Sequence, residues 1–210
     1  MPGLIHGLDA KRVRANLERV RERAGADVEI LAATKYIPLE EMGVLAEAGV
    51  TLVGENRLQD LEAKRERWGD AFTWDFIGNL QSRKVKRILP LVRLIHSVAS
   101  DSALRQLERH AERETEVLVE VNVAGEEQKG GIRPVDLGPF IARCPVRVAG
   151  LATMPPFATD PESSRPFFAR LAELATEHGL RRMSMGSSQD WEVALDEGAT
   201  MLRLGTVLYA

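Results

Sequence analysis

The first part of the chain with a clear periodic pattern is residues 9–23. Val13, Leu17 and Val20 recur three and four residues apart among charged side chains, which places them on one face of an α-helix. Asp9 comes just before them, and a short carboxylate at that position accepts hydrogen bonds from the first amides of a helix. The pattern therefore predicts an amphipathic helix near the start of the chain.

Beyond this helix, short apolar runs alternate with longer amphipathic stretches. The runs are typical of strands that are buried on both faces, and the stretches between them are typical of helices. The predicted strands cover residues 28–34, 52–53, 73–77, 92–96, 116–123, 146–151, 182–185 and 201–204. The predicted helices cover residues 56–67, 82–89, 101–113, 134–143, 163–178 and 188–197, and a further helix begins at Pro38.

This alternation predicts an α/β fold with a parallel sheet. Parallel neighbours cannot be joined by a hairpin, so right-handed crossovers through helices connect them. Eight such units match a single (β/α)8 TIM barrel with an extra N-terminal helix, and 210 residues is at the short end of that fold's range. A doubly wound open sheet gives the same pattern and stays an alternative. At this length we expect one domain over residues 1–210.

Composition and charge narrow the functional classes. The 28 Lys and Arg residues against 31 Asp and Glu residues give a net charge of −3, which argues against a dedicated nucleic-acid-binding protein. No apolar run approaches the roughly 20 residues that span a bilayer. Residues 1–9 lack the pattern of a secretion signal. We therefore expect a cytoplasmic protein with neither a membrane nor a nucleic acid as its partner.

His96 and Cys144 are interpreted as structural residues. The four histidines are scattered through the chain without metal-ligand spacing, so His96, at the end of a strand, is expected to be hydrogen-bonded and no metal site is predicted. Cys144 has no second cysteine with which to pair, and a buried thiol is the expectation.

Lysine is scarce in this chain, and Lys35 directly follows an apolar strand. The carboxyl end of a strand is where α/β folds place their sites. A lysine there is partly desolvated, which raises the fraction of free amine that can attack a carbonyl. Schiff-base chemistry on Lys35 is the predicted use, and a lysine that only extends into solvent is the alternative. The other lysines are expected in polar surroundings: Lys11, Lys64, Lys84, Lys86 and Lys129.

Two turns of small residues follow the last strands of the predicted sheet. Residues 184–188 (Ser-Met-Gly-Ser-Ser) lead from a strand into a helix, and residues 203–206 (Arg-Leu-Gly-Thr) end the final strand. In a barrel, the loops after the seventh and eighth strands commonly bind a phosphate through backbone amides, and hydroxyl groups add donors. Together with Lys35, these turns predict a site for a phosphate ester that carries an aldehyde. Pyridoxal 5′-phosphate (PLP) fits that description.

A resemblance to a known family covers essentially the whole chain. Its motifs occur in order at residues 31–35 (LAATK), 54–56 (GEN), 76–82 (FIGNLQS), 96–100 (HSVAS), 121–122 (VN), 129–132 (KGGI), 150–151 (GL), 184–186 (SMG), 190 (D) and 203–206 (RLGT). In these motifs the chain resembles the pyridoxal phosphate homeostasis proteins, also called PROSC-like proteins. The resemblance implies a barrel like the N-terminal domain of alanine racemase, with PLP bound to Lys35 as a Schiff base. It also implies a role in holding the cofactor and delivering it to apo-enzymes, without established turnover.

The resemblance also implies roles for further residues of these motifs. The phosphate is expected at Ser184, Gly205 and Thr206, joined by backbone groups around Gly186 and Ser187. Arg203 is expected to face the pyridine nitrogen. A guanidinium cannot accept a proton, so it keeps that nitrogen unprotonated and makes the ring a poorer electron sink. Asn56 and Asn79 are expected near the ring or its 3′-oxygen.

Two other functions stay open. An amino-acid racemase shares the barrel and the lysine, but it needs an acid or a base on each face of the α-carbon. In alanine racemase the opposite group is a tyrosine from a second domain of the partner subunit. Here no second domain is expected, and the two tyrosines are Tyr36 and Tyr209. The other alternative is a phosphate-binding adaptor that contacts a partner through the basic residues 83–87, although a solvated helix face is the simpler reading of that cluster.

Overall fold

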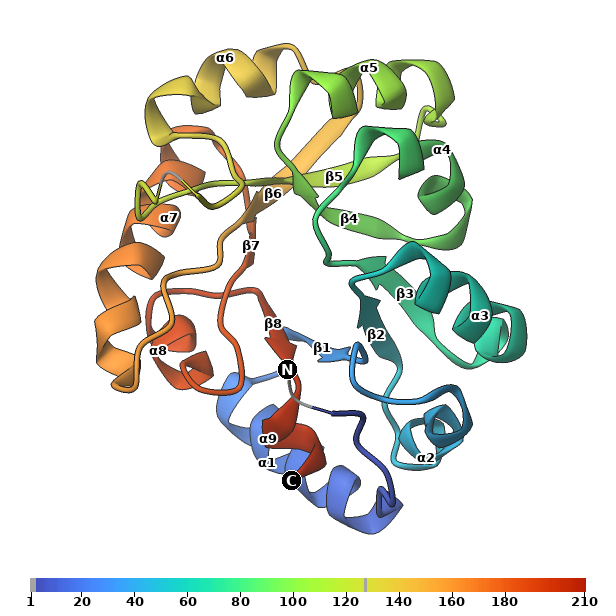
Figure 1. Ribbon diagram of the computed structural model, residues 1–210. Coiled ribbons are helices and arrows are strands. Elements are labelled where there is room, and N and C mark those ends of the chain that lie inside the picture. The colour runs from blue at the N-terminus through green and yellow to red at the C-terminus, as the bar shows by residue number, and fades with distance from the viewer. Residues whose placement is uncertain (1–2, 127) are drawn as a thin grey trace.

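The computed structural model describes residues 3–126 and 128–210. Within these residues, eight parallel strands close into a barrel in the order in which they occur along the chain. The strands are β1 Glu29–Ala33, β2 Leu52–Glu55, β3 Thr73–Phe76, β4 Leu94–Val98, β5 Glu116–Glu120, β6 Arg147–Ala152, β7 Arg182–Ser184 and β8 Met201–Leu204. Figure 1 shows them at the centre of the molecule with the helices around them.

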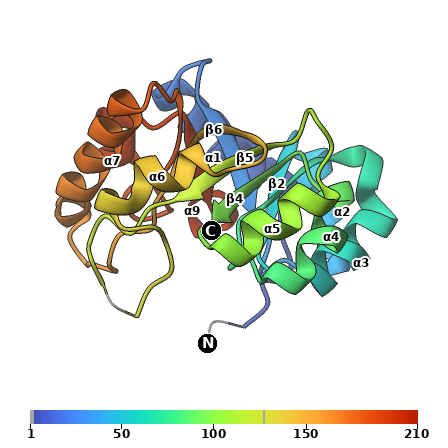
Figure 2. The same cartoon turned by 90° about the horizontal axis from the view of Figure 1, so that it is seen from above.

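Helices follow each of the strands and form the outer layer. The α-helices are α1 Ala10–Ala24, α2 Met42–Glu47, α3 Leu58–Trp68, α4 Val85–Ile88, α5 Asp101–His110, α6 Leu137–Ala142, α7 Arg165–Glu177, α8 Trp191–Asp196 and α9 Thr206–Tyr209. Short 3₁₀ helices flank several of them: η1 Leu39–Glu41, η2 Gly69–Ala71, η3 Ser82–Lys84, η4 Leu89–Leu91, η5 Pro134–Asp136 and η6 Pro161–Ser164. In the view of Figure 2, α6 and α7 lie to one side of the strands and α2 and α3 to the other.

Pairing between the first and last strands settles the architecture. Glu29 and Leu31 of β1 lie in register with Met201 and Arg203 of β8, so the sheet has no free edge in the described residues. The predicted (β/α)8 barrel is therefore confirmed, and the open-sheet alternative is excluded. Closure also brings the ends of β1 and β8 together, although about 170 residues separate them in the sequence.

The extra N-terminal helix is α1, and it has the predicted cap. The Asp9 carboxylate accepts hydrogen bonds from the amides of Lys11 and Arg12. Its apolar stripe is buried against the rest of the molecule. The short helix α9 packs beside α1 (Figure 1), where Asn16 donates to the carbonyl of Ala210 over 2.9 Å. The sequence pattern did not predict α9, because four residues are too few to display a helical period.

The wall of the barrel has two faces with different partners. Leu31, Leu118 and Met201 point to the barrel interior and pack together there. Their neighbours in the same strands belong to a second, larger core between the sheet and the helices. Successive residues of a strand point to opposite faces, so each strand supplies both cores. The predicted strand boundaries agree to within three residues, and the largest difference is in β5, which ends at Glu120 rather than at residue 123.

Two further expectations bear on the surface. Cys144 is half-buried, and partial burial raises the pKa of its thiol above the usual value. The basic residues Arg83, Lys86 and Arg87 are exposed, and Arg87 pairs with Glu62 on α3. Among the residues described here, none of the helices combines the length and the apolar character needed to cross a membrane.

Candidate functional site

A cavity of about 370 Å³ opens at the carboxyl ends of the strands. It is lined by Ile5, Ala33, Lys35, Tyr36, Asn56, Ile77, Met154, Ser187, Ser188, Gln189, Arg203, Gly205, Thr206 and Tyr209. The structure thus brings together six predicted site residues from four separate loops and strand ends: Lys35, Asn56, Ser187, Arg203, Gly205 and Thr206. In the described chain, Asn79, Ser184 and Gly186 are not part of this lining.

The alternation of β1 directs Lys35 to the cavity. Leu31 lies inside the barrel, Ala33 lines the cavity, and Lys35 follows on the same side of the chain. The Lys35 ammonium lies 4.6 Å from the centre of the Tyr36 ring, a cation–π contact. The side chain is exposed, so the expected partial desolvation of Lys35 is wrong. The residue stands beyond the end of the strand, where no neighbouring strand covers it, and its amine is accessible from solvent.

Lys64, which was expected among polar residues, is instead the buried lysine. Its ammonium forms an ion pair with Glu55 and donates to the carbonyl of Thr34 over 2.7 Å. The Thr34 hydroxyl donates to the same Glu55 oxygen over 2.7 Å. The side chains of Lys64 and Glu55 are 6% and 0% exposed, so water does not screen the attraction between their charges. This group of three residues fixes the backbone immediately before Lys35.

The sequence carried a signal for the burial of Lys64. On α3, the buried residues are Leu58, Leu61 and Lys64, which recur three residues apart and therefore lie on one face of the helix. The register of an apolar stripe thus predicts a buried lysine, even though the residues next to it in sequence are charged. A buried lysine at such a position needs a partner, and Glu55 supplies it.

Asn56 presents an unsatisfied acceptor at the cavity. Its backbone amide donates to Glu55 over 3.1 Å, which holds the residue in place. Its side-chain oxygen Oδ1 is buried and accepts no hydrogen bond from the described residues. A buried polar atom without a partner costs about 1–3 kcal/mol, so a ligand with a donor at this point would be stabilised. Asn79, by contrast, is exposed.

The two turns of small residues meet at Ser188, which the sequence reasoning did not select. The Ser188 hydroxyl oxygen accepts hydrogen bonds from the amides of Gly205 and Val207, at 2.9 and 3.3 Å. Amides that converge on one point form a concavity suited to an anionic oxygen. The sequence could have identified Ser188 by its position, because it is the second of two hydroxyl residues that follow Gly186.

Ser187 and Gly186 fix the conformation of the turn at residues 184–188. The amide and the hydroxyl of Ser187 both donate to Asp190, at 2.7 and 2.8 Å, and Asp190 also accepts from Ser164. Gly186 has a φ of +88°, and a Cβ at this position would lie 2.6 Å from the Cβ of Ala194. Only glycine combines this backbone conformation with so close an approach.

Arg203 forms the floor of the cavity, with Ser184 directly beneath it. The Nη1 group of Arg203 donates to the carbonyl and to the hydroxyl of Ser184, and Nη2 donates to the carbonyl of Thr153 over 2.7 Å. Burial lowers the pKa of Arg203, while the charges of Glu120 and Asp190 act in the opposite direction. A guanidinium titrates so far above neutrality that it stays a cation. The structure places Ser184 behind Arg203 rather than against the cavity.

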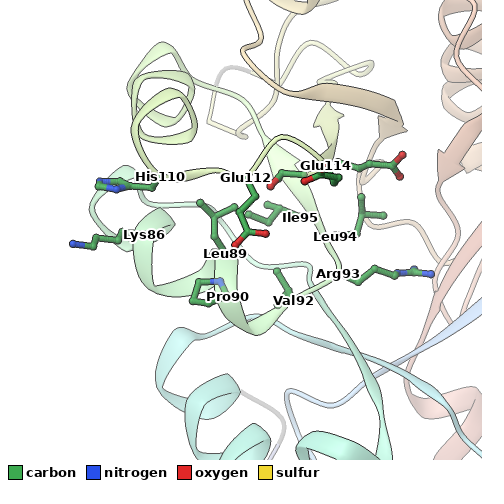
Figure 3. A pocket seen from close by; sticks show the side chains of 12 residues that line it. Lys86, Leu89, Pro90, Val92, Arg93, Leu94, Ile95, His110, Glu112 and Glu114 are labelled. Carbon is green, nitrogen blue, oxygen red and sulfur yellow. The ribbon is translucent and has the colours of Figure 1, made fainter.

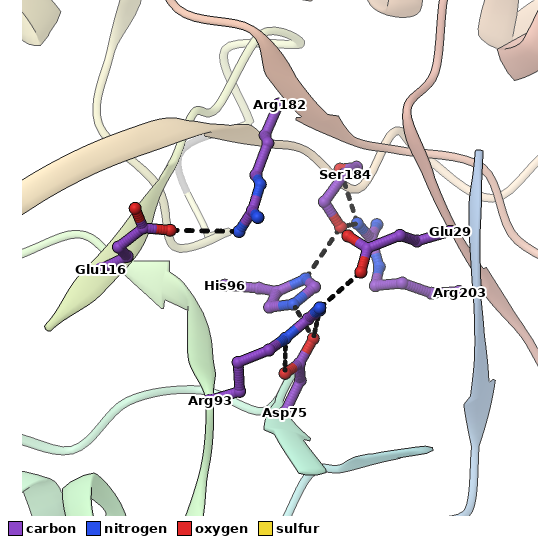
Figure 4. A network of polar contacts seen from close by, with 8 residues as sticks. All are labelled: Glu29, Asp75, Arg93, His96, Glu116, Arg182, Ser184 and Arg203. Carbon is purple, nitrogen blue, oxygen red and sulfur yellow. Dashed lines mark hydrogen bonds and ion pairs between the residues drawn. The ribbon is translucent and has the colours of Figure 1, made fainter. Parts of the chain in front are cut away.

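The polar contacts of Ser184 continue into the barrel (Figure 4). Its hydroxyl lies 2.9 Å from Nδ1 of His96, and Nε2 of His96 lies 3.1 Å from the Asp75 carboxylate. Arg93 donates to both oxygens of Asp75, at 3.1 and 2.8 Å. His96 is therefore a hydrogen-bonded residue of the interior, as the sequence analysis expected.

A larger cavity of about 590 Å³ lies at the other end of the barrel (Figure 3). It is formed where β4 and β5 begin, and its lining includes Lys86, Arg93, His110, Glu112 and Glu114. In parallel α/β folds the amino ends of the strands serve stability, and sites lie at the carboxyl ends. The predicted site residues gather in the smaller cavity, which is therefore the candidate site.

Comparisons with known proteins agree on one family. The family model described as the N-terminal domain of alanine racemase matches residues 8–210. A protein of Aquifex aeolicus named pyridoxal phosphate homeostasis protein is 39% identical over 215 residues, which covers 94% of each chain. A protein of the same name from Pseudomonas aeruginosa is 34% identical and covers 94% of this chain and 92% of its own.

Solved structures share the fold of this chain. PipY of Synechococcus elongatus PCC7942, solved with PLP bound, is 29% identical with a TM-score of 0.83, and the match covers 94% of this chain and 100% of PipY. The alanine racemase of Clostridium difficile 630 has a TM-score of 0.76 at 17% identity. The match covers 96% of this chain and 57% of that racemase, and at this identity it shows the fold alone.

Proposed function

The chain belongs to the family of pyridoxal phosphate homeostasis proteins, and from this premise we propose that it binds PLP in the cavity and holds it as a Schiff base on Lys35. The observation that carries the proposal is that the Lys35 amine and the turn at Gly205 and Thr206 line one cavity of about 370 Å³. An amine binds the aldehyde of the cofactor, and hydroxyl and amide donors bind its phosphate.

The remaining cavity residues fit the same ligand. The unsatisfied Oδ1 of Asn56 offers an acceptor to a ring hydroxyl. The convergent amides of Gly205 and Val207, which Ser188 now satisfies, offer donors to a phosphate oxygen. The groups are chemically complementary to PLP: a carbonyl-reactive amine, an acceptor for the ring and donors for the anion.

The chemistry that PLP supplies when bound is the withdrawal of electrons from a carbon attached to its imine. Arg203 limits that chemistry. Its two Nη groups are committed to Ser184 and Thr153, and its Nε donates to no group in the described residues. Because a guanidinium donates and never accepts, it leaves a ring nitrogen unprotonated. Arg203 therefore makes the bound ring a poorer electron sink, although an arginine at this place does not by itself prevent turnover.

The second tyrosine argues against a racemase. Racemisation requires a base on one face of the substrate carbon and an acid on the other, so in the two directions of the reaction each group must both lose and gain a proton, and Lys35 serves one face. The Tyr209 hydroxyl donates to the carbonyl of Ala33 over 3.1 Å, and burial raises its pKa above the usual value. A tyrosine in this state is a poor base. We propose that the protein has no racemase activity and that it delivers PLP to apo-enzymes; these partners and a cytoplasmic location stay predictions.

Reduction with borohydride tests the proposal. Purified protein mixed with PLP should develop visible absorbance, and borohydride should then attach the cofactor permanently to Lys35, which peptide mapping locates. Lys35→Ala should lose the reducible species while keeping the circular dichroism of the folded protein. Lys129→Ala, which removes a half-exposed lysine outside the cavity, is the matched control and should react like the unmodified protein. Labelling of Lys84, Lys86 or Lys129 in place of Lys35 would contradict the site.

Incubation of the PLP-loaded protein with L-alanine tests the absence of racemisation. We expect no enzyme-like appearance of D-alanine, because Tyr209 does not supply the second base. Rapid formation of D-alanine that is lost in Lys35→Ala would favour the racemase.

A further inference from the structure

The interior of this barrel contains a line of polar side chains where branched apolar residues usually pack. Asp75 on β3, His96 on β4 and Ser184 on β7 lead from Arg93 to Arg203 (Figure 4). Asp75 and Ser184 are fully buried, and His96 is 3% exposed. Buried polar groups cost free energy unless they are hydrogen-bonded, and each member of this line has a partner on both sides.

Arg203 at one end and the Asp75 carboxylate at the other fix the direction of the hydrogen bonds in the line. A guanidinium only donates, so the Ser184 hydroxyl oxygen accepts from Arg203. The hydroxyl hydrogen of Ser184 is then free to point at Nδ1 of His96. The Asp75 carboxylate only accepts, so the proton of the neutral ring sits on Nε2 and is donated to Asp75, which leaves Nδ1 to accept from Ser184. The carboxylate end of the line thereby selects one tautomer of His96, and the same tautomer lets the Ser184 hydroxyl accept from Arg203 while it donates to His96.

Arg203 depends on this line because it has no carboxylate as a hydrogen-bond partner in the described residues. Its acceptors are the hydroxyl of Ser184 and the backbone carbonyls of Ser184 and Thr153. The carbonyls are fixed by the sheet, whereas the hydroxyl accepts from Arg203 only while its own hydrogen points away. His96 provides the acceptor that keeps it pointing away, and Asp75 holds His96 in the tautomer that can accept.

From this geometry we infer that Asp75 and His96 are positioning residues: through Ser184, they hold the Arg203 guanidinium in the orientation that faces a ring nitrogen in the cavity. The inference deepens the proposed function and rests on it for the ligand, since PLP is the ring-nitrogen compound proposed there. Neither Asp75 nor His96 lines the cavity, so both act only through their neighbours.

Two ligands that differ in one atom separate positioning from simple structural support. The probes are PLP and 1-deaza-PLP, which replaces the ring nitrogen by a carbon and keeps the aldehyde and the phosphate. The unmodified protein should bind PLP more tightly than 1-deaza-PLP, because Arg203 donates to the ring nitrogen only in PLP. In His96→Leu this preference should fall about five- to tenfold, the loss expected when one hydrogen bond to a charged group is weakened. Affinity for 1-deaza-PLP should not change.

Matched variants keep the test decisive. His96→Asn places a side-chain acceptor near the position of Nδ1, so it should retain a preference within about twofold of the unmodified protein. Ser184→Ala deletes the link itself and should lose the preference as His96→Leu does, which carries the test if His96→Leu does not fold. Leu118→Ala opens a cavity in the apolar half of the same interior and should leave the preference unchanged.

A measurement without any ligand separates failure of the inference from failure of the proposed function. In the ligand-free protein, the guanidinium ¹⁵N resonances of Arg203 should shift in His96→Leu and not in Leu118→Ala. If the unmodified protein binds neither probe, the proposed function is wrong, and these resonances still decide whether His96 positions Arg203. Unchanged Arg203 resonances, or an equal loss of affinity for both probes in His96→Leu, would overturn the inference.

Discussion

Two buried polar networks lie on opposite faces of the same barrel wall, and each supports one residue of the cavity. On the outer face, Lys64 and Glu55 pair beneath Thr34, the residue before Lys35. On the inner face, Asp75 and its neighbours lead through Ser184 to Arg203 (Figure 4). The strand alternation separates them, because successive residues of a strand point to opposite faces.

The networks differ in how their charges are compensated. The outer network is closed: one ammonium meets one carboxylate, and neither side chain reaches water. The inner network is open at its lower end, where Arg93 is 33% exposed and also pairs with Glu29. Removal of one charge from the outer network leaves the opposite charge buried without a partner. Removal of the Asp75 charge from the inner network leaves Arg93 with Glu29 and with solvent. The backbone before Lys35 is thus held by a buried ion pair, whereas Arg203 is held by the direction of hydrogen bonds.

The largest loss of stability is expected in the outer network, where each buried charge has a partner of opposite sign. Lys64→Met leaves the Glu55 carboxylate buried without its counter-charge, so the free energy of unfolding should fall by about 3–5 kcal/mol. Urea denaturation followed by circular dichroism measures the change. The double variant Lys64→Met with Glu55→Gln should recover part of the loss, because no unpaired charge is then buried.

An exposed ion pair between α3 and α4 is the control for this prediction. Arg87 and Glu62 pair at 2.7 Å, with side chains that are 62% and 34% exposed. Arg87→Met should cost less than about 1 kcal/mol, because water screens the charges in both states. If Lys64→Met costs no more than Arg87→Met, the outer network is not a closed ion pair.

A smaller effect is expected from the open network. Asp75→Asn removes the carboxylate that Arg93 and His96 share, but Arg93 keeps Glu29 and its access to solvent. The free energy of unfolding should therefore fall by about 1–3 kcal/mol, the cost of weakened buried hydrogen bonds. The same denaturation experiment compares the two sites. A loss as large as that of Lys64→Met would remove the distinction between the networks.

The smallest effect is a dependence of stability on pH that comes from His96. Burial lowers the pKa of His96 below its usual value of 6.5; the Asp75 charge opposes this shift, and the charges of Arg203 and Arg93 add to it. Below pH 6.5 the unfolded chain takes up a proton that the folded protein does not, so stability falls as the pH falls from 6.5 toward the lowered pKa. The slope is at most about 1.4 kcal/mol per pH unit.

The variant His96→Leu isolates this contribution. Its stability relative to the unmodified protein should rise as the pH falls from 6.5 to 5.5, because the variant has no histidine to protonate at this position. Thermal unfolding at a series of pH values measures the difference. Parallel curves for the two proteins would show that the pKa of His96 is not lowered in the folded state.

The sequence by itself determined the order of strands and helices and the place of the reactive lysine. The alternation of apolar runs and amphipathic stretches is a local property, and it identified the eight strands found in residues 3–126 and 128–210 and the capped helix α1. Lys35 could be placed at a strand end for the same reason. Glycine and hydroxyl residues in the last two turns likewise pointed to the cavity wall at Gly205 and Thr206.

Only the tertiary structure decided what each side chain touches. Closure of the barrel set β1 beside β8, which brought Lys35 and Arg203 to one cavity. It also made Lys64 the buried lysine and left Lys35 exposed, the reverse of the sequence-based expectation. Burial depends on which elements pack against a residue, and a local pattern does not specify that packing. For the same reason, the place of Ser184 beneath Arg203 followed from the pairing of β7 with β8 and not from its motif.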